Sequence, residues 1–455
     1  MTDLKEMILD TLKSKDIEAL KALLSDAESL EVSYVMYDLS PEEQVIVFRL
    51  LSKDDALFVF EHLDVVMQQK LLKSFTDEKA IEIVAELAPD SRVRLLEEIP
   101  ATVAKKLINS LSPEEREVTN ILLGYGPETA GRIMTTEFIS LRREMTVEQA
   151  LNKIREQAKD KETIYTLFVT DNAKKLEGAL TLKQLLVSDI SAKIEDIMSE
   201  AIINVSTGTD QEEAANILKE LDLLALPVVD NEGRIVGIIT VDDAMDVLEE
   251  EATEDIYDQA GLVDVTSKET NRSEVLVNGN LWDIWKVRLP FLFITLCAGV
   301  LSGLVIDGFE ETLESIAMVA IFIPLIMDMG GSVGTQSSTV FVRGVVLGHV
   351  HMKKFVKHFL KEIGIGFSIG SLIGLLAGII AMLWQGVPML GVAVGLSLVF
   401  TMTLASLLGF LVPYMLIKLN IDQAAGSAPI ITSIKDVAGL IIYFVSVSIF
   451  LGNML

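Results

Sequence analysis

The stretch Pro324-Leu-Ile-Met-Asp-Met-Gly-Gly-Ser-Val-Gly-Thr-Gln-Ser-Ser-Thr339 lies inside an apolar segment that runs from residue 316 to residue 347. It contains three glycines, five hydroxyl residues and the carboxylate of Asp328. Irregular or polar structure at membrane depth is tolerated where it is buried in protein or lines a water-filled cavity. Glycines equally suit close contacts between membrane helices. The stretch alone fits both interpretations, and Asp328 favours a water-filled path.

Four further apolar segments surround this one. Together the five are residues 289–306, 316–347, 363–384, 387–417 and 424–451, and about 20 apolar residues suffice to cross a bilayer. Four lysines precede the third segment, whereas only acidic residues precede the second. By the positive-inside rule we expect a multi-pass protein of the plasma membrane, embedded in the lipid bilayer, with a cytosolic N-terminal module and its C-terminus outside.

The last segment carries Lys435 and Asp436. A carboxylate at the bilayer centre costs about 2.5–3.5 kcal/mol on insertion scales, so it needs a partner or a wet cavity. A structural Lys435–Asp436 pair is the alternative, but adjacent helical residues point about 100° apart, so we expect the two side chains not to face each other. We predict that Asp436 and Asp328 line an ion path and that Asp422 lies at its cytosolic mouth.

Charge is distributed unevenly along the chain. The 38 basic and 66 acidic residues give a net charge of −28. Residues 271–455 contain ten of each sign, so the excess of acid lies entirely upstream. An acidic module has no basic face to neutralise phosphates, which argues against nucleic acid as a partner. The single cysteine, Cys297, excludes intrachain disulfides and thiolate metal sites.

The first 125 or so residues read as short amphipathic helices. Leu-Ser-Pro-Glu-Glu occurs at Leu39–Glu43 and again at Leu111–Glu115, and each copy places Ser before Pro at a helix start. Between the copies, apolar residues recur every three or four positions. Recurring short helices predict an α-solenoid, in which each helix pair buries a face against the next, and an irregular helical bundle is the alternative.

The next region repeats itself in a mixed helix and strand pattern. Ile133-Met-Thr matches Ile197-Met-Ser, Leu167-Phe-Val-Thr-Asp-Asn matches Leu226-Pro-Val-Val-Asp-Asn, and Gly178-Ala-Leu-Thr matches Gly237-Ile-Ile-Thr. The number of positions between matching residues of the two copies is larger at the first match than at the later ones, which predicts a five-residue insertion in the first copy. These ordered matches resemble a tandem pair of cystathionine-β-synthase (CBS) domains, the β-α-β-β-α regulatory module.

Over essentially its whole length the chain is similar to the MgtE family of magnesium channels and transporters. The resemblance rests on the glycine-rich motif that starts at Gly330, on Glu-Ala-Thr-Glu-Asp-Ile at Glu251–Ile256, and on Lys435-Asp-Val. It implies that Gly331 and Ser332 belong to the pore beside Asp436, although family members often have Asn where this chain has Ser332. It also implies a homodimer, because one Asp436 per chain is too few to encircle a hydrated Mg²⁺ ion.

The predicted fold class is multidomain: an α-solenoid N-terminal domain, α/β tandem CBS domains, then an all-α five-helix transmembrane domain. The expected boundaries are 1–128 for the helical domain, 129–191 and 192–250 for the CBS domains, 251–280 for a connecting plug helix and 281–455 for the membrane domain.

The resemblance further implies regulatory Mg²⁺ binding to acids of the soluble half. These are Asp90, Glu212, Asp222, Asp243, Asp246, Glu251, Glu254 and Asp255. For any one of them the alternative is an ordinary solvated surface. Carboxylates gathered without cations repel, so Mg²⁺ would favour a compact arrangement in which the connecting helix blocks the pore.

A weaker motif concerns nucleotides. Gly237-Ile-Ile-Thr-Val-Asp-Asp243 has the form by which CBS modules hold ribose and phosphate through Thr240 and Asp243, whereas the first copy ends in Gln184. One intact half-site leaves ATP open as a modulator.

These features predict an Mg²⁺-selective channel or transporter for magnesium uptake that its own sensor shuts. The alternatives are a channel that also admits Co²⁺, Ni²⁺ or Mn²⁺, and a non-transporting membrane sensor that reads nucleotide through the CBS pair. An enzyme is not expected, because the sequence contains no P-loop, Ser/His/Asp arrangement or zinc-ligand spacing.

Overall fold

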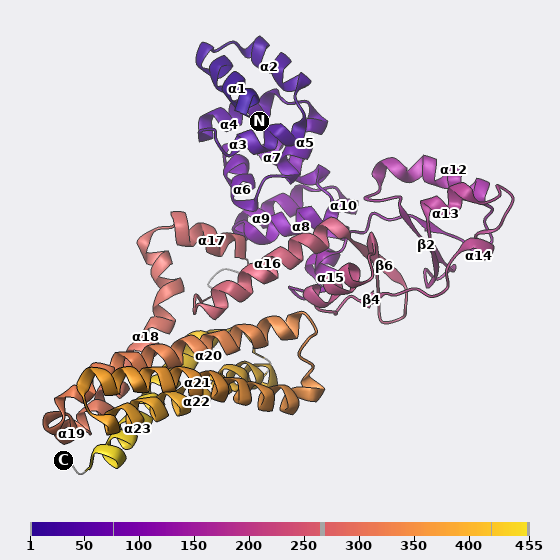
Figure 1. Cartoon of the computed structure of the whole chain (residues 1–455). Helices are drawn as coiled ribbons and strands as arrows, with labels where there is room; N and C mark the ends of the chain where they lie inside the picture. Colours follow the sequence, from indigo (N-terminus) through magenta and orange to yellow (C-terminus); the bar gives the residue numbers. More distant parts are fainter. Residues whose placement is uncertain (1, 76, 264–268, 420, 453–455) are drawn as a thin grey trace. The chain divides into compact units, whose positions relative to one another are not determined.

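The computed structural model describes residues 2–75, 77–263, 269–419 and 421–452 (Figure 1). The chain forms two compact units, Met1–Glu251 and Ala252–Leu455. The first unit contains the solenoid helices and the two small sheets, and the second contains the long apolar helices.

Short helices build the N-terminal part of the first unit. They are α1 (Thr2–Ser14), α2 (Ile17–Asp26), α3 (Ser29–Met36), α4 (Pro41–Leu50), α5 (Lys53–Glu61), α6 (Val65–Ser74), α7 (Asp77–Glu86), α8 (Pro89–Glu98), α9 (Ala101–Ser110) and α10 (Pro113–Leu123). Most of them pack on the helix two positions further along, such as α2 on α4, α4 on α6 and α8 on α10. This stacking confirms the predicted α-solenoid.

The repeated pentapeptide starts α4 and α10 by the same mechanism. Ser40 and Ser112 each cap the backbone of the glutamate three residues later, and that glutamate accepts a hydrogen bond from the serine amide in return. Proline occupies the first helical position in both copies, where its missing N–H is not needed.

Two three-stranded sheets follow, one in each copy of the internal repeat. The first copy contains α11 (Ala130–Ile133), β1 (Ser140–Leu141), α12 (Val147–Gln157), η1 (Ala158–Asp160), β2 (Thr166–Thr170), β3 (Leu176–Thr181) and α13 (Leu182–Val187). The second contains α14 (Ile194–Ile197), β4 (Val205–Ser206), α15 (Gln211–Glu220), β5 (Ala225–Val229), β6 (Ile235–Thr240) and α16 (Val241–Gln259). In each sheet the first strand is parallel to the second and the second antiparallel to the third. The inserted residues of the first copy include η1, which has no counterpart after α15.

The two copies cover each other's glycines. A Cβ at Gly237 would lie 2.5 Å from Sδ of Met134, and a Cβ at Gly178 would lie 2.5 Å from Sδ of Met198. Thr135 pairs with the strand of Gly237, and Ser199 pairs with the strand of Gly178. The Ile-Met-Thr/Ser segment that opens each copy therefore packs against the Gly-x-x-Thr strand of the other copy.

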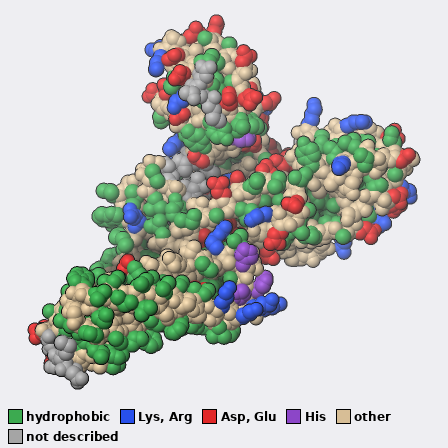
Figure 2. Space-filling model, viewed as in Figure 1, with side chains coloured by type: hydrophobic (Ala, Val, Ile, Leu, Met, Phe, Trp, Pro, Cys, Tyr) green, Lys and Arg blue, Asp and Glu red, His purple; other side chains and the backbone are tan. Residues whose placement is uncertain are grey.

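The second unit contains five helices long and apolar enough to cross a membrane, as predicted. Its elements are the end of α16, α17 (Glu269–Asn278), α18 (Leu281–Asp307), α19 (Glu310–Ser315), η2 (Ala317–Phe322), α20 (Ile323–Val346), η3 (Met352–Lys354), α21 (Phe355–Gln385), α22 (Pro388–Lys418) and α23 (Ser427–Leu451). Hydrophobic side chains cover the visible outer surface of this unit (Figure 2), as a bilayer environment requires.

Residues 251–280, predicted as the connecting plug helix, contain the end of α16 and all of α17, and α16 is followed by Gly261 with a φ of +75°. Residues 264–268 of the predicted plug segment lie outside the described residues. The glycine-rich stretch is not irregular, because α20 is helical from Ile323 to Val346.

Candidate cation site

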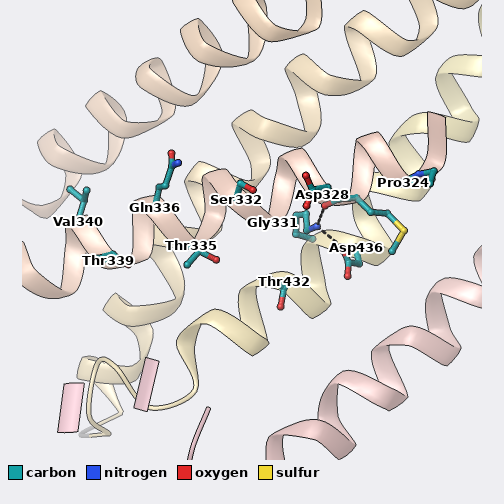
Figure 3. Close-up of a pocket in the computed structure, with 12 residues that line it drawn as sticks. Pro324, Asp328, Gly331, Ser332, Thr335, Gln336, Thr339, Val340, Thr432 and Asp436 are labelled. Atoms are coloured by element: carbon teal, nitrogen blue, oxygen red, sulfur yellow. Dashed lines mark hydrogen bonds and ion pairs between the residues drawn. The ribbon is translucent and has the colours of Figure 1, made fainter. Parts of the chain in front are cut away.

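A groove of about 980 Å³ runs between α20 and α23. It is lined by Pro324, Met327, Asp328, Gly331, Ser332, Thr335, Gln336, Thr339, Val340, Thr432, Lys435 and Asp436. Figure 3 shows the two carboxylates near one end and Gln336 and Thr339 toward the other. The groove therefore brings together four of the five predicted pore residues, namely Asp328, Gly331, Ser332 and Asp436.

Helical spacing explains why one face of α20 is polar. Asp328, Ser332, Gln336 and Thr339 are three or four residues apart, so they share a face, and all four are exposed in this chain. A membrane-spanning helix cannot present a carboxylate and an amide to hydrocarbon at low energy. This face of α20 therefore requires water or another protein surface.

The opposite face of α20 packs tightly against its neighbours. A Cβ at Gly330 would meet Thr401 of α22 at 2.9 Å, and a Cβ at Gly334 would meet Ile431 of α23 at 2.8 Å. Ser337 on this buried side donates to Glu362 of α21 at 2.7 Å. The close-packing interpretation of the glycine-rich stretch is therefore confirmed for the buried face of α20, and the water-filled path stays a prediction for its exposed face.

Lys435 is buried beside the groove, with an exposed fraction of 2%. Its ammonium donates to the carbonyl oxygen of Met327 and forms an ion pair with Asp436. The expectation that Lys435 and Asp436 would not face each other is therefore wrong. The long lysine stem lets the ammonium reach a carboxylate that the helical angle alone would place out of line.

Asp422 does not line the groove. It is exposed in the loop before α23, and its carboxylate accepts a hydrogen bond of 2.7 Å from the amide of Ala424. This contact holds the turn that leads into α23.

The end of α16 reaches the groove-lining helix. Thr339 donates to the side chain of Gln259 at 3.2 Å, and the amide of Gly426 donates to the carbonyl of Asp258 at 2.8 Å. Arg272, which is fully buried, forms an ion pair of 2.7 Å with the Asp258 carboxylate and donates to the carbonyl of Leu262. Sequence reasoning did not find this contact set, because nothing in the local pattern links residues 258–272 to residue 339.

In the first unit, acidic side chains gather around Asp90, which is buried, and Asp243, which is half-buried. Burial, and next the charge of Glu162, raises the pKa of Asp90 to about 7. Burial, and next the charge of Asp90, raises the pKa of Asp243 to about 8. Glu162 is exposed, but desolvation by the surrounding protein raises its pKa to about 7, with Asp243 as its strongest charged neighbour. One carboxylate oxygen of Asp90, Oδ1, is buried without a hydrogen-bond partner among the described residues.

We call Asp90, Glu162 and Asp243 the central acids. The charges of Glu61, Glu137 and Asp242 also act on them. Sequence analysis found Asp90 and Asp243 only through the family resemblance, and it missed Glu162, Glu61 and Glu137. These three look like solvated surface acids, and no sequence signal shows that the fold brings them together.

A second group of acids surrounds Glu251. Burial raises the pKa of Glu251 to about 7 against the opposing hydrogen bond of 2.7 Å from Gln211, and the charges of Glu212, Asp210 and Glu128 raise it further. Predicted residues Glu212 and Glu251 are thus neighbours. Glu254 and Asp255 lie half-buried on the next turn of α16, in the second unit.

Two predicted regulatory residues lie differently. Asp246 forms an ion pair of 2.7 Å with Arg94 of α8, and Arg94 also contacts Glu250 at 3.0 Å. Asp222 is exposed just after α15 with a φ of +51°, and no side-chain contact joins it to either acidic group in the described part of the chain. In that same part, no three His, Cys, Asp or Glu side chains are close enough to enclose a metal ion.

Thr240 and Asp243, predicted to contact nucleotide, bond to each other: the Thr240 hydroxyl donates to the Asp243 carboxylate at 2.5 Å. In the first copy Thr181 and Gln184 make the equivalent contact at 2.9 Å as a capping box of α13. The motif therefore has a structural role at both helix starts. Asp243 also belongs to the central acids, so the predicted nucleotide half-site and this acidic group share one carboxylate.

Known proteins match this chain in all its parts. The MgtE family, described as a divalent cation transporter, matches residues 323–446, the MgtE intracellular N domain matches residues 27–128, and CBS domains match residues 130–189 and 194–250. The magnesium transporter MgtE of Thermus thermophilus is 35% identical and the alignment covers 95% of each chain. That of Bacillus subtilis is 28% identical over 98% of this chain and 97% of its own.

Two solved structures resemble the soluble half. The cytosolic domain of the Mg²⁺ channel MgtE in complex with ATP is 34% identical with a TM-score of 0.52, and it covers 53% of this chain and 99% of its own. The soluble part of a magnesium transporter is 33% identical with a TM-score of 0.52, covering 55% and 99%. These relatives are named as transporters or channels. With matches to the N domain, the CBS pair and the membrane region in one order, the chain belongs to the MgtE family.

Proposed function

We propose that this chain carries Mg²⁺ across the membrane through the groove between α20 and α23. The observation that carries the proposal is the polar face of α20, where Asp328, Ser332 and Gln336 are exposed on a membrane-spanning helix opposite Asp436. The relatives named magnesium transporters support Mg²⁺ as the ion.

The chemistry of the groove suits a hydrated ion. Mg²⁺ dehydrates reluctantly and keeps several of its waters. Carboxylates at Asp328 and Asp436, with hydroxyls at Ser332, Thr335 and Thr432, offer acceptors for those waters. A groove of about 980 Å³ has room for an ion with its hydration shell.

A second copy of the chain completes the path in this proposal. Among the described residues the groove is lined from α20 and α23, and its polar side chains Asp328, Ser332, Gln336 and Thr339 are exposed in one chain. A homodimer with two facing grooves would remove these side chains from lipid and supply two copies of Asp436 to one ion. The same exposed face thus supports the predicted homodimer.

Mg²⁺ also acts as the regulator in this proposal. The central acids repel one another, and Oδ1 of Asp90 is buried without a hydrogen-bond partner among the described residues. A bound divalent cation would therefore reduce the repulsion that protonation otherwise relieves. A fully coordinated site is not needed, because Mg²⁺ can bind through its waters. The end of α16, held by Gly426 and Thr339, is the element by which the soluble half would shut the path.

ATP is a proposed modulator at the Thr240 and Asp243 half-site. The relative crystallised with ATP supports it. The proposed orientation has the first unit in the cytosol and the C-terminus outside the plasma membrane, by the loop charges described above.

Reconstituted flux tests the proposal. We expect purified protein in proteoliposomes to take up Mg²⁺. Asp436→Ala should abolish uptake, because the groove then lacks the carboxylate that α23 contributes. Asp307→Ala, an exposed acid at the end of α18, is the matched control and should transport normally. Full Mg²⁺ uptake by Asp436→Ala would reject the groove as the path. Equal uptake of Co²⁺, Ni²⁺ or Mn²⁺ would favour the broader channel instead.

A further inference from the structure

Lys435 is the one basic side chain among the described residues that line the groove. A fixed positive charge beside a cation path opposes cation binding. Its position thus needs an explanation that goes beyond the presence of Asp436.

The packing of α20 against α23 fixes the position of the Lys435 side chain, and we call this position the lysine seat. Its stem crosses α20 at the paired glycines: a Cβ at Gly330 would lie 2.6 Å from Cδ of Lys435, and a Cβ at Gly331 would lie 3.3 Å from its Nζ. The ammonium then reaches the Met327 carbonyl, which α20 presents to the groove. Any larger residue at position 330 would collide with the stem, so the glycine pair and Lys435 form one arrangement.

The Lys435 ammonium also forms an ion pair with Asp436, the carboxylate proposed to bind the ion. Lys435 pairs with Asp436, and Asp436 keeps 29% of its side chain exposed toward the groove, whereas Lys435 keeps 2%. The carboxylate can thus accept an ion from the groove while the lysine remains seated on Met327. An ion in the groove can therefore replace Lys435 as the partner of Asp436, whereas the hydrogen bond from Lys435 to Met327 stays in place.

We propose that Lys435 is a tethered competitor cation, which neutralises Asp436 when the groove holds no ion and is displaced from it by the transported ion. The inference rests on the proposed function of the groove. Conduction requires binding that is strong enough for entry and weak enough for release. By returning to Asp436, the ammonium weakens the hold on a departing ion and prevents the carboxylate from trapping it.

The test measures Mg²⁺ uptake by full-length protein in proteoliposomes as a function of external Mg²⁺. Lys435→Met keeps the length and apolar stem of the side chain and removes its charge. We expect its half-saturating Mg²⁺ concentration to fall by about tenfold, because an attractive carboxylate is freed from a close charge partner. The maximal rate should fall as well, because release slows. Lys435→Arg keeps the charge and should stay within about threefold of the natural protein on the concentration scale.

The glycines supply a matched pair of variants that leave Lys435 itself in place. The new methyl group of Gly330→Ala would collide with the Lys435 stem. That of Gly334→Ala would collide with Ile431 on the same face of α20 and would not contact Lys435. Gly330→Ala should lower the half-saturating concentration and Gly334→Ala should not. Equal values for these two variants, or an unchanged value for a monodisperse Lys435→Met protein, overturn the proposal.

The outcomes also separate this inference from the proposed function. If Asp436→Ala abolishes uptake while Lys435→Met leaves the concentration dependence unchanged, the groove is the path and Lys435 is only structural. If Asp436→Ala transports normally, the path lies elsewhere and the competitor role of Lys435 falls with it.

Discussion

The central acids make the compact form of the soluble half sensitive to pH. Asp90 and Asp243 have pKa values of about 7 and about 8 in this arrangement, against ordinary values near 3.8. A carboxyl whose pKa is raised by folding favours the folded arrangement when protonated. The stabilisation is therefore fully present below pH 4 or so and is lost as the pH rises through about 7 to 8.

Mg²⁺ should compete with these protons. If the ion binds only when Asp90 and Asp243 are both ionised, the concentration needed for half-binding falls by about a hundredfold between about pH 6.5 and about pH 8.5. Asp243→Asn removes the carboxyl with the higher pKa. The Mg²⁺ concentration for half-binding should then fall only about fourfold over the same pH range, because Asp90 alone still titrates. Its absolute affinity for Mg²⁺ should also be lower, because one carboxylate is missing.

Limited proteolysis of the full-length protein measures this effect. The Mg²⁺ concentration that gives half-protection is determined at each pH, and cleavage of an unfolded substrate corrects for the protease's own pH dependence. Asp222→Asn, an exposed acid outside both acidic groups, should behave as the natural protein. A half-protecting concentration that changes by less than about threefold over this pH range would refute the reasoning.

Three further variants test the contacts that hold the parts in place. Arg94→Met removes two partly exposed ion pairs to α16, which together are worth about 1 kcal/mol. About fivefold more Mg²⁺ should therefore be needed for half-protection. High salt should cause a similar increase in the natural protein, because it screens the same ion pairs. Arg272→Met removes the ion pair with Asp258, at a cost of about 3 kcal/mol to the contacts that hold the end of α16, and Mg²⁺ flux should persist at concentrations that shut the natural protein. Ser112→Ala removes the cap of α10 and should lower the stability of the helical domain by about 1 kcal/mol, seen as a lower Tm, with the exposed Ser110→Ala as control.

The parts of the fold that sequence predicts well are those with local or repeated signals. The pentapeptides at residues 39–43 and 111–115 carry their own caps, and the apolar segments exceed the length that a bilayer needs. That Asp328 and Asp436 lie in a groove is predictable for a related reason. A charge such as Asp436 inside an apolar segment is costly enough to need a special environment.

The rest depends on contacts that sequence distance hides. Glu61, Glu137 and Glu162 come from different helices and loops, and each is individually ordinary. Only the tertiary fold places Glu137 and Glu162 near Asp90, and Glu61 near Glu162. The Lys435 prediction failed because it used the helical angle alone and ignored the length of the side chain. The glycines of α20 open the route that the stem follows, and that role appears only when α20 and α23 are packed together.

The exchange of methionines between the CBS copies has a consequence for how this region can change. Met134 covers Gly237, and Met198 covers Gly178, so each copy carries the lid of the other. Neither copy can be excised, duplicated or replaced alone without uncovering a strand in the one that stays. A larger residue at either glycine has to be matched by a smaller one about a hundred positions upstream in one case and about twenty downstream in the other. The two CBS copies therefore form one structural unit, and substitutions in one copy are constrained by the residues of the other.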